Sequence, residues 1–338
     1  MKESDPTMSG AEPVSQKKHK WWKSRLVVAA GLLLAAGVFA WLIRGIVDNR
    51  EMLATQLADT PPWILAGVVV VQLLFMLCIG LCYYNSLRLA GARVIKTQAI
   101  SVYLASQLGK FVPGKVLYVA GQIGLATWLR ISTTQSVLGF TAHHIHLVAM
   151  GMAVAGPLLG MLIEPRLMIV IATLAGLGVV VMASGVWVKL FNAFQRKRRK
   201  PELETFTPLR ALAALLSAGI GWVAYGLIAV LFTMALTPDL SPDTFLGIGM
   251  AAVAAWLLGF LSFITPVGVG VREGTFVLLT HSIIPEPTAM AVALLMRLLL
   301  TAFQVPIGAL AFTVVIKSRP VAETGAAEQP SSGDTGER

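Results

Sequence analysis

The stretch F-I-T-P-V-G-V-G-V-R-E-G, residues 263–274, places an arginine, a glutamate and three glycines in an otherwise apolar run. The run is long enough to cross a membrane, so charged residues interrupt a helix at membrane depth. Lipid-exposed backbone cannot leave its N–H and C=O groups unpaired, and an interrupted helix is tolerated only where it packs inside protein or lines a wet cavity. A cavity that contains charged groups predicts a polar cargo.

The rest of the chain has the composition of a membrane protein. Of its 338 residues, 56% are hydrophobic and 13% are charged, against roughly 25% charged in a soluble domain. Apolar segments of about 20 residues recur along nearly the whole length. We therefore expect one membrane domain at residues 25–317, between a basic cytoplasmic tail at residues 1–24 and a disordered cytoplasmic tail at residues 318–338.

The net charge of +10 does not indicate nucleic-acid binding, because the basic residues form short blocks that flank apolar segments. Such blocks set topology by the positive-inside rule, and residues 196–200 are the strongest cytoplasmic marker. We expect no nucleic-acid partner, and a location in the cell (inner) membrane with both termini cytoplasmic. The first apolar run, residues 25–46, also fits a signal peptide, but its length favours an uncleaved anchor.

The apolar segments predict an all-α, multi-pass fold with about eight crossings. These are residues 25–46, 62–84, 136–163, 167–191, 209–236, 244–262, 263–284 and 288–316. Residues 98–129 are interrupted by G-K-F-V-P-G-K, residues 109–115, and each half is too short to cross about 30 Å at 1.5 Å per residue. Because basic residues flank this segment on both sides, we expect a re-entrant hairpin here. Residues 263–284, in contrast, are expected to make a net crossing.

The two interrupted segments suggest an internal repeat. F-V-P-G-K at residues 111–115 and F-I-T-P-V-G at residues 263–268 share an aromatic residue, a β-branched residue, proline and glycine. Transporters often hold their substrate between two such broken helices in corresponding halves. The shared residues are few, so the repeat is a hypothesis at this point.

Arg272 and Glu273 are adjacent in sequence and cannot face each other on a helix, so each needs a partner from elsewhere. An Arg or Asp at mid-bilayer costs roughly 2.5 to 3.5 kcal/mol on insertion scales. The candidate partners are Lys110, Lys115 and Arg297. Four cations around one acid leave a positive surplus, which would bind an anion such as phosphate. Lys110 and Lys115 would equally suit the role of interfacial anchors.

Arg297 lies well inside the last apolar span, and Thr301 and Gln304 follow it one and two turns later. The spacing i, i+4 and i+7 places all three side chains on one face of a helix. A polar stripe on an apolar helix should face protein or a cavity rather than lipid. We therefore include Arg297 and Gln304 among the candidate binding residues.

The histidines and cysteines are expected to be structural. His143, His144 and His146 would suit a metal site or a proton relay, but no Asp, Glu or Cys lies in the same span, which favours packing or headgroup contact. Cys78 and Cys82 lie one helical turn apart, and two thiols alone cannot complete a tetrahedral metal site. We expect no metal and no cofactor.

The elements G-K-F-V-P-G-K-V at residues 109–116 and P-V-G-V-G-V-R-E-G at residues 266–274, with the late Arg297, resemble the lysylphosphatidylglycerol synthase transmembrane region family. Its members are flippase-like membrane domains, found alone or fused to a cytoplasmic aminoacyl-transfer domain. The resemblance covers roughly residues 25–316 and implies a stand-alone member without the synthase domain. It places these residues along a lipid pathway: Lys110, Pro113, Gly114, Lys115, Pro266, Gly268, Gly270, Arg272, Glu273 and Arg297.

Within that resemblance, Gln304 departs from the family, whose members often have an acid there, and its uncharged amide cannot form the charge pair that an acid would. The residues expected to be structural at the helix breaks are Pro113, Gly114, Pro266, Gly268, Gly270 and Gly274.

We therefore expect a protein that moves a phosphate-bearing lipid, anionic or aminoacylated, between leaflets, with a phosphatidylglycerol derivative or a polyprenyl phosphate as cargo. The expected headgroup-binding residues are Lys110, Lys115, Arg272, Glu273, Arg297 and Gln304. The alternative is a non-transporting accessory protein that binds an anionic lipid or a partner enzyme. An enzyme is disfavoured, because a membrane transferase would need several carboxylates or a metal site, and the spans hold almost none.

Overall fold

The computed structural model describes residues 44, 47, 50–58, 60–111, 116–163, 165–197, 207–261 and 270–318, and these residues form helices and turns without a strand among them. Both predicted tails, apart from Ser318, and nearly all of the first predicted span lie outside the described residues. The same holds for five of the predicted site residues: Pro113, Gly114, Lys115, Pro266 and Gly268.

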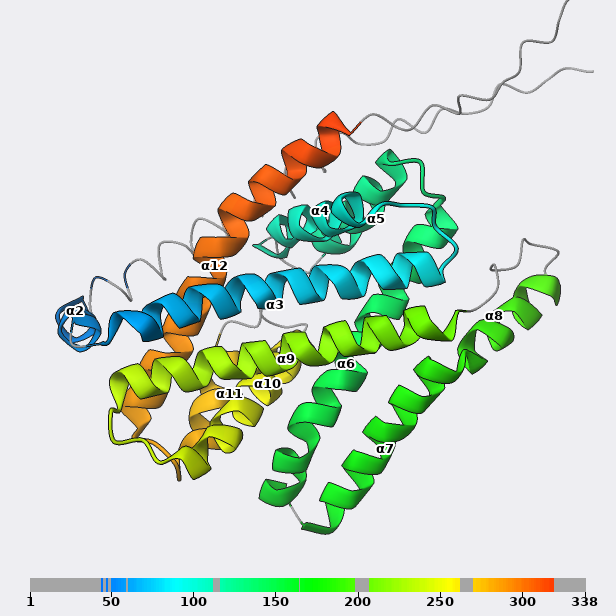
Figure 1. Cartoon of the computed structure of the whole chain (residues 1–338). Helices are drawn as coiled ribbons and strands as arrows, with labels where there is room; N and C mark the ends of the chain where they lie inside the picture. Colours follow the sequence, from blue (N-terminus) through cyan, green and yellow to red (C-terminus); the bar gives the residue numbers. More distant parts are fainter. Residues whose placement is uncertain are drawn as a thin grey trace, which may run out of the picture.

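The fold is a bundle of long and short helices (Figure 1). In chain order they are α2 (Arg50–Ala58), α3 (Pro62–Leu89), α4 (Lys96–Ser106), the 3-10 helix η1 (Gln107–Phe111), α5 (Val116–Trp128), α6 (Thr133–Ile163), α7 (Pro165–Ser184), α8 (Val186–Lys197), α9 (Pro208–Leu236), η3 (Pro242–Thr244), α10 (Phe245–Leu261), α11 (Val271–Thr280) and α12 (Glu286–Lys317). Within the part of the chain that the structure describes, five segments are long and apolar enough to cross a membrane: Pro62–Leu89, Thr133–Leu158, Pro208–Leu236, Pro242–Leu261 and Glu286–Lys317. The predicted all-α, multi-pass class is confirmed.

Local sequence explains where the long helices start. Pro62, Pro208 and Pro287 lie in the first turns of α3, α9 and α12, where a missing N–H costs no helical hydrogen bond and the fixed φ suits the helix. Large apolar side chains then cover the outside of the bundle as well as its core, as Val70 and Leu310 illustrate with exposed fractions of 64% and 66%. Such a surface suits lipid contact rather than water.

α3 and α9 lie side by side through the centre of the bundle (Figure 1). Near the end of α3, the carbonyl of Arg88 accepts a hydrogen bond from Nη1 of Arg210, near the start of α9, at 3.4 Å. Farther along, a methyl group on Gly221 would lie 2.5 Å from Cδ1 of Ile79. The two helices therefore run antiparallel and pack closely where glycine leaves room.

Each of these central helices begins the same series of elements. α3 is followed by short α4, a break, short α5 and long α6, which together form the N-terminal unit, residues 62–163. α9 is followed by α10, a break, short α11 and long α12, which form the C-terminal unit, residues 208–317. The predicted repeat between the two broken segments corresponds to this shared series.

The two units also exchange contacts reciprocally. In one direction, a methyl group on Gly308 of α12 would lie 3.1 Å from the Leu104 carbonyl oxygen of α4. In the other, a methyl group on Gly151 of α6 would lie 2.9 Å from a methyl of Leu257 in α10. The second helix of each unit, α4 or α10, thus packs on the last long helix of the other unit. Together with the antiparallel α3 and α9, this makes the units inverted copies of one arrangement, as in many transporters.

The first break follows the predicted interruption. α4 holds 11 residues and α5 holds 13, and each is shorter than a crossing requires. Between them, η1 passes close to the start of α5, since a methyl group on Gly109 would lie 2.6 Å from the backbone of Leu117 and Tyr118. Glycine at this position is what permits the close approach.

The second break separates α10 from α11, which run back along each other. Gly247 near the start of α10 lies beside Ile283, just after α11, and Gly259 near the end of α10 contacts Arg272 near the start of α11. α11 has 10 residues, which extend about 15 Å and reach across about half of the hydrocarbon core. A net crossing by residues 263–284 would therefore depend on residues 262–269, which the structure does not describe.

The predicted span at residues 167–191 is divided between two helices. α7 ends at Ser184 and α8 begins at Val186, because Gly185 between them has a φ of 69°. Glycine adopts this left-handed conformation at little cost, and it ends a helix. α8 then carries Arg196 and Lys197 in its last turn.

Candidate functional site

The second break ends in a helix start that is built around Glu273. Gly270 precedes α11 with a φ of 80°, and its backbone N–H donates a hydrogen bond to Oε2 of Glu273 at 2.7 Å. A carboxylate at the third position of a helix accepts a hydrogen bond from a backbone N–H that has no partner within the helix. Its negative charge is also stabilised by the positive end of the helix dipole. Gly274, in contrast, lies inside α11 rather than at the break, because Gly270 already supplies the unusual backbone conformation.

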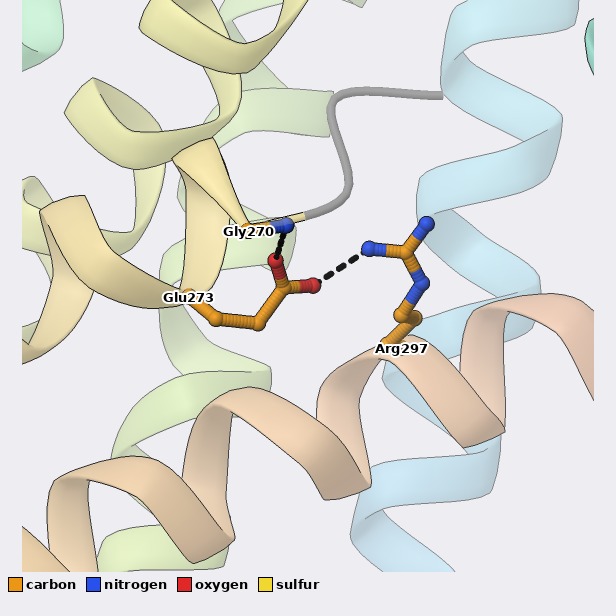
Figure 2. Close-up of polar contacts among 3 residues, drawn as sticks. All are labelled: Gly270, Glu273 and Arg297. Atoms are coloured by element: carbon orange, nitrogen blue, oxygen red, sulfur yellow. Dashed lines mark hydrogen bonds and ion pairs between the residues drawn. The ribbon is translucent and has the colours of Figure 1, made fainter. Parts of the chain in front are cut away.

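Glu273 also forms a buried ion pair with Arg297. Figure 2 shows its other carboxylate oxygen, Oε1, accepting a hydrogen bond from Nη1 of Arg297 on α12. The two residues are only 7% and 9% exposed. Of the three predicted partners, Lys110, Lys115 and Arg297, the structure thus shows Arg297 paired with Glu273.

Arg272 points to a different environment from its neighbour, as the helix geometry requires. Its guanidinium carbon lies 4.8 Å from the centroid of the Trp256 ring, and its Cγ packs against Gly259. Its Nε atom is buried and has no hydrogen-bond partner among the described residues. Arg272 therefore lies against an aromatic face, where cation–π attraction replaces part of its hydration.

These charged groups line one small cavity, which we call the first cavity. Its volume is about 30 Å³, roughly the share of one water molecule. Its lining residues are Tyr225, Ala252, Ala255, Arg272, Glu273, Phe276, Ala293, Met296, Arg297 and Leu300. Two arginines and one glutamate leave one uncompensated positive charge in this lining.

A glycine pair offers a test of how tightly Arg272 is held. Gly259→Ala would place a methyl group against Cγ of Arg272, whereas a methyl group at Gly274 meets nothing within 4 Å. We expect Gly259→Ala to destabilise the protein by about 1 to 3 kcal/mol through overpacking. Gly274→Ala should be neutral or stabilising by up to about 1 kcal/mol, because alanine is the better helix former. Thermal unfolding in detergent measures both, and equal melting temperatures would contradict the close contact.

A second cavity, of about 20 Å³, is lined in part by Trp256. Nζ of Lys110 lies 5.1 Å from the Tyr118 ring centroid and 6.0 Å from that of Trp256. Its lining residues are Phe75, Ile79, Tyr103, Lys110, Tyr118, His144, Leu147, Trp222, Trp256, Phe260 and Gln304. Trp256 therefore has a cation from each broken segment against it: Lys110 from the first and Arg272 from the second.

The predicted site residues are thus divided between two cavities. Arg272, Glu273 and Arg297 line the first cavity, and Lys110 and Gln304 line the second. The polar stripe on α12 does face the protein interior, since Gln304 is 8% exposed.

Three contributors were not among the predicted site residues: Tyr118, His144 and Trp256. Trp256 lies in an apolar run that is typical of a core helix, so sequence alone gave it no distinguishing signal. Tyr118 follows the first break by less than one turn, and His144 belongs to a histidine cluster for which packing was favoured. His144 does pack, since its ring stacks on Phe260 with centroids 5.6 Å apart, but Nε2 also lies 3.1 Å from the Tyr118 hydroxyl.

The part of the chain that contains both cavities matches a known protein family. A family model for the lysylphosphatidylglycerol synthase TM region matches residues 28–308. The chain belongs to this family. No curated protein matches it. The match to the lysylphosphatidylglycerol synthase TM region includes every lining residue of the two cavities. Together with the apolar helices, it makes the chain a multi-pass membrane protein related to lipid handling.

Proposed function

We propose that this protein moves a phosphate-bearing lipid between the two leaflets of the membrane. The observation that carries the proposal is the position of Arg272, which is held against Trp256 beside an ion pair that is already complete. Both carboxylate oxygens of Glu273 are engaged, one by Gly270 and one by Arg297. Arg272 has no ion-pair partner among the described residues, so its charge is available to a cargo.

Phosphate is the chemistry that suits this position. A guanidinium can bind a phosphate through two parallel hydrogen bonds, and such charge-assisted bonds are stronger than neutral ones. A phosphodiester carries one negative charge, which would balance the single surplus positive charge of the first cavity. A phosphatidylglycerol derivative, with or without an aminoacyl group, meets this requirement, and so does the singly ionised form of a polyprenyl phosphate, while the hydrocarbon chains remain in the bilayer.

Both cavities are too small to hold a headgroup in this conformation. Their volumes of about 30 and 20 Å³ compare with about 300 Å³ or more for ligand sites. Passage of a headgroup therefore requires the short helices around Trp256 to move apart. In the proposed transport cycle, this conformation would be the closed one.

Charge favours one orientation in the cell (inner) membrane. The end of the bundle where α3 finishes and α9 starts carries Arg88, Arg93, Lys96 and Arg210, and the opposite end carries Asp239, Asp243 and Glu286. By the positive-inside rule the first end is cytoplasmic. The proposed topology has about eight crossings, a re-entrant α4–α5 hairpin and both termini in the cytoplasm. Labelling single cysteines at positions 93 and 239 from each side tests it, since Cys78 and Cys82 are buried.

Lipid exchange by the purified protein tests the function. The protein is reconstituted into vesicles of phosphatidylcholine and phosphatidylglycerol that contain a fluorescent phosphatidylglycerol, and dithionite is added outside. Dithionite does not cross the bilayer, so it bleaches only label that lies in, or reaches, the outer leaflet. We expect complete bleaching with the protein and loss of the outer-leaflet signal alone in protein-free vesicles. Identical traces would instead favour an accessory protein that binds lipid without moving it.

A further inference from the structure

The two inverted units place different chemical groups at matching positions. Tyr118 is the third residue of α5, and Glu273 is the third residue of α11. His144 is the twelfth residue of α6, and Arg297 is the twelfth residue of α12. The Tyr118–His144 hydrogen bond in the N-terminal unit is therefore the counterpart of the Glu273–Arg297 ion pair in the C-terminal unit.

The two cavities match in the same way. Tyr103 of α4 and Ala252 of α10 are each the eighth residue of their helix, and they line the second and the first cavity respectively. Leu147 and Leu300, the fifteenth residues of α6 and α12, correspond as well. The second cavity is thus the N-terminal unit's version of the first, with a titratable histidine where the first has a permanently charged arginine.

Hydrogen bonding defines the protonation of His144 in this conformation. Nδ1 lies 2.8 Å from the carbonyl oxygen of Phe140, which can only accept, so Nδ1 carries the hydrogen. Nε2 is then the acceptor of the Tyr118 O–H at 3.1 Å. The lone pair of Nε2 is the position at which a further proton would bind, and the added charge would lie where the other unit has Arg297.

Buried polar groups lead toward His144 from the basic end of the bundle. Several buried atoms of the N-terminal unit have no hydrogen-bond partner among the described residues, including Ser136 Oγ, His146 Nε2, both ring nitrogens of His143, Tyr83 Oη and the Gln122 amide. In the described part of the C-terminal unit, Arg272 Nε is the one such atom. Buried groups of this kind are normally satisfied by ordered water.

Some of these groups lie near one another, in two separate sets. The His146 Nδ1 atom lies 3.3 Å from the hydroxyl of Ser86, two residues before Arg88 at the basic end. The His143 ring centroid is 5.4 Å from that of Tyr83 and 5.0 Å from that of His144. Imidazole rings with hydroxyls and water can pass protons within a membrane protein.

We infer that His144 takes up a proton when a headgroup phosphate enters the second cavity. Lipid binding is thereby coupled to proton uptake. The inference rests on the proposed function. The proton binds Nε2, whose N–H then donates to the Tyr118 oxygen. The Tyr118 hydroxyl is released to donate its own hydrogen to a phosphate oxygen. When the lipid leaves, the proton returns from Nε2 to solvent.

The surroundings of His144 make proton uptake depend on the phosphate. Among the described lining residues, the ionisable groups are Lys110 of η1, Tyr103 of α4 and Tyr118 of α5, with His143 adjacent on α6 and no acid. The other helices that line the second cavity, α3, α9, α10 and α12, contribute Phe75, Ile79, Trp222, Trp256, Phe260 and Gln304. On its outer side His144 faces Leu174 and Gly178 of α7, which are not ionisable. The Lys110 charge opposes protonation of an empty cavity, and a bound phosphate reverses that balance. By linkage, protonation must then strengthen phosphate binding by the same factor.

Proton-linked binding tests this directly. The full chain in detergent is titrated with dihexanoyl phosphatidylglycerol by calorimetry, in buffers of different ionisation enthalpy, between about pH 5.5 and 8.5, which brackets histidine titration. Wild-type affinity should rise as the pH falls, by up to about tenfold per pH unit, the limit for one linked proton, with net proton uptake near neutral pH. His144→Gln should bind more weakly and without His-range pH dependence. His144→Arg should bind tightly at all pH values, a rescue that a merely structural histidine would not give.

Two further variants keep the test decisive. His281→Gln, at an exposed position just after α11, should behave as wild type. Tyr118→Phe keeps the ring but lacks the hydroxyl, so it should retain proton uptake and bind about tenfold more weakly, as for one lost hydrogen bond to a charged group. Equal proton uptake by wild type and His144→Gln, unchanged affinity in Tyr118→Phe, or no binding by wild type would overturn the inference. Proton-linked binding without lipid exchange would instead overturn translocation alone.

Discussion

Arg272→Gln is expected to slow leaflet exchange about 100-fold, because a hydrogen-bonded contact between two charged groups contributes roughly 3 kcal/mol. Its guanidinium lies over Trp256 and has no ion pair with a described residue, so removing it leaves no acid unpaired. The variant should therefore keep the wild-type melting temperature in detergent while it loses exchange in the dithionite assay. This separation of function from stability is what distinguishes a cargo-binding arginine from a structural one.

Two matched variants sharpen the Arg272 result. Arg272→Lys keeps the charge and loses the planar fork, so we expect an intermediate rate, about tenfold below wild type. Arg93→Gln removes an arginine that is exposed in the turn between α3 and α4, and it should exchange lipid normally. If Arg272→Gln exchanged lipid as fast as wild type, Arg272 would not lie on the lipid path.

Glu273→Ala is expected to cost about 3 to 5 kcal/mol of stability, the range for breaking one side of a buried ion pair. The substitution leaves Arg297 buried without its acid, close to Arg272 in the first cavity. It also removes the acceptor of the Gly270 N–H at the start of α11. Chemical or thermal unfolding in detergent measures the loss.

A double variant separates the ion pair from the packing around it. Glu273→Met combined with Arg297→Met removes both charges, so it should be more stable than either single variant. Glu286→Ala, at the exposed start of α12, is the control and should change stability by less than about 0.5 kcal/mol. Single effects that simply add in the double variant would show that the two side chains do not stabilise each other.

The sequence could predict which charged residues belong to the site, but not how these residues are distributed between the two cavities. The adjacency of Arg272 and Glu273 required separate partners, and the structure gives Glu273 the partner Arg297 that was among the candidates. Lys110 reaches the same region through the Trp256 ring. That arrangement depends on which helices pack together, and periodicity carries no information about helix pairing.

The helix breaks show a similar limit. Both proline- and glycine-rich interruptions were readable, because short apolar halves cannot cross a bilayer. The break at Gly185 was missed, since a single glycine in an apolar run is usually tolerated inside a helix. Its φ of 69° is a property of the folded backbone. In the sequence the repeat was visible only as a short motif. The correspondence of Tyr118 with Glu273, and of His144 with Arg297, could be recognised only once the structure had shown at which residue each helix begins.

The close packing of α3 on α9 has a mechanical consequence. Gly221 brings Ile79 so near that sliding one helix along the other would force side chains into backbone, and interiors packed this densely resist compression. The central pair therefore acts as a stationary frame. If lipid passes through the protein as proposed, the movement that admits it would then have to come from the short helices on either side of this frame.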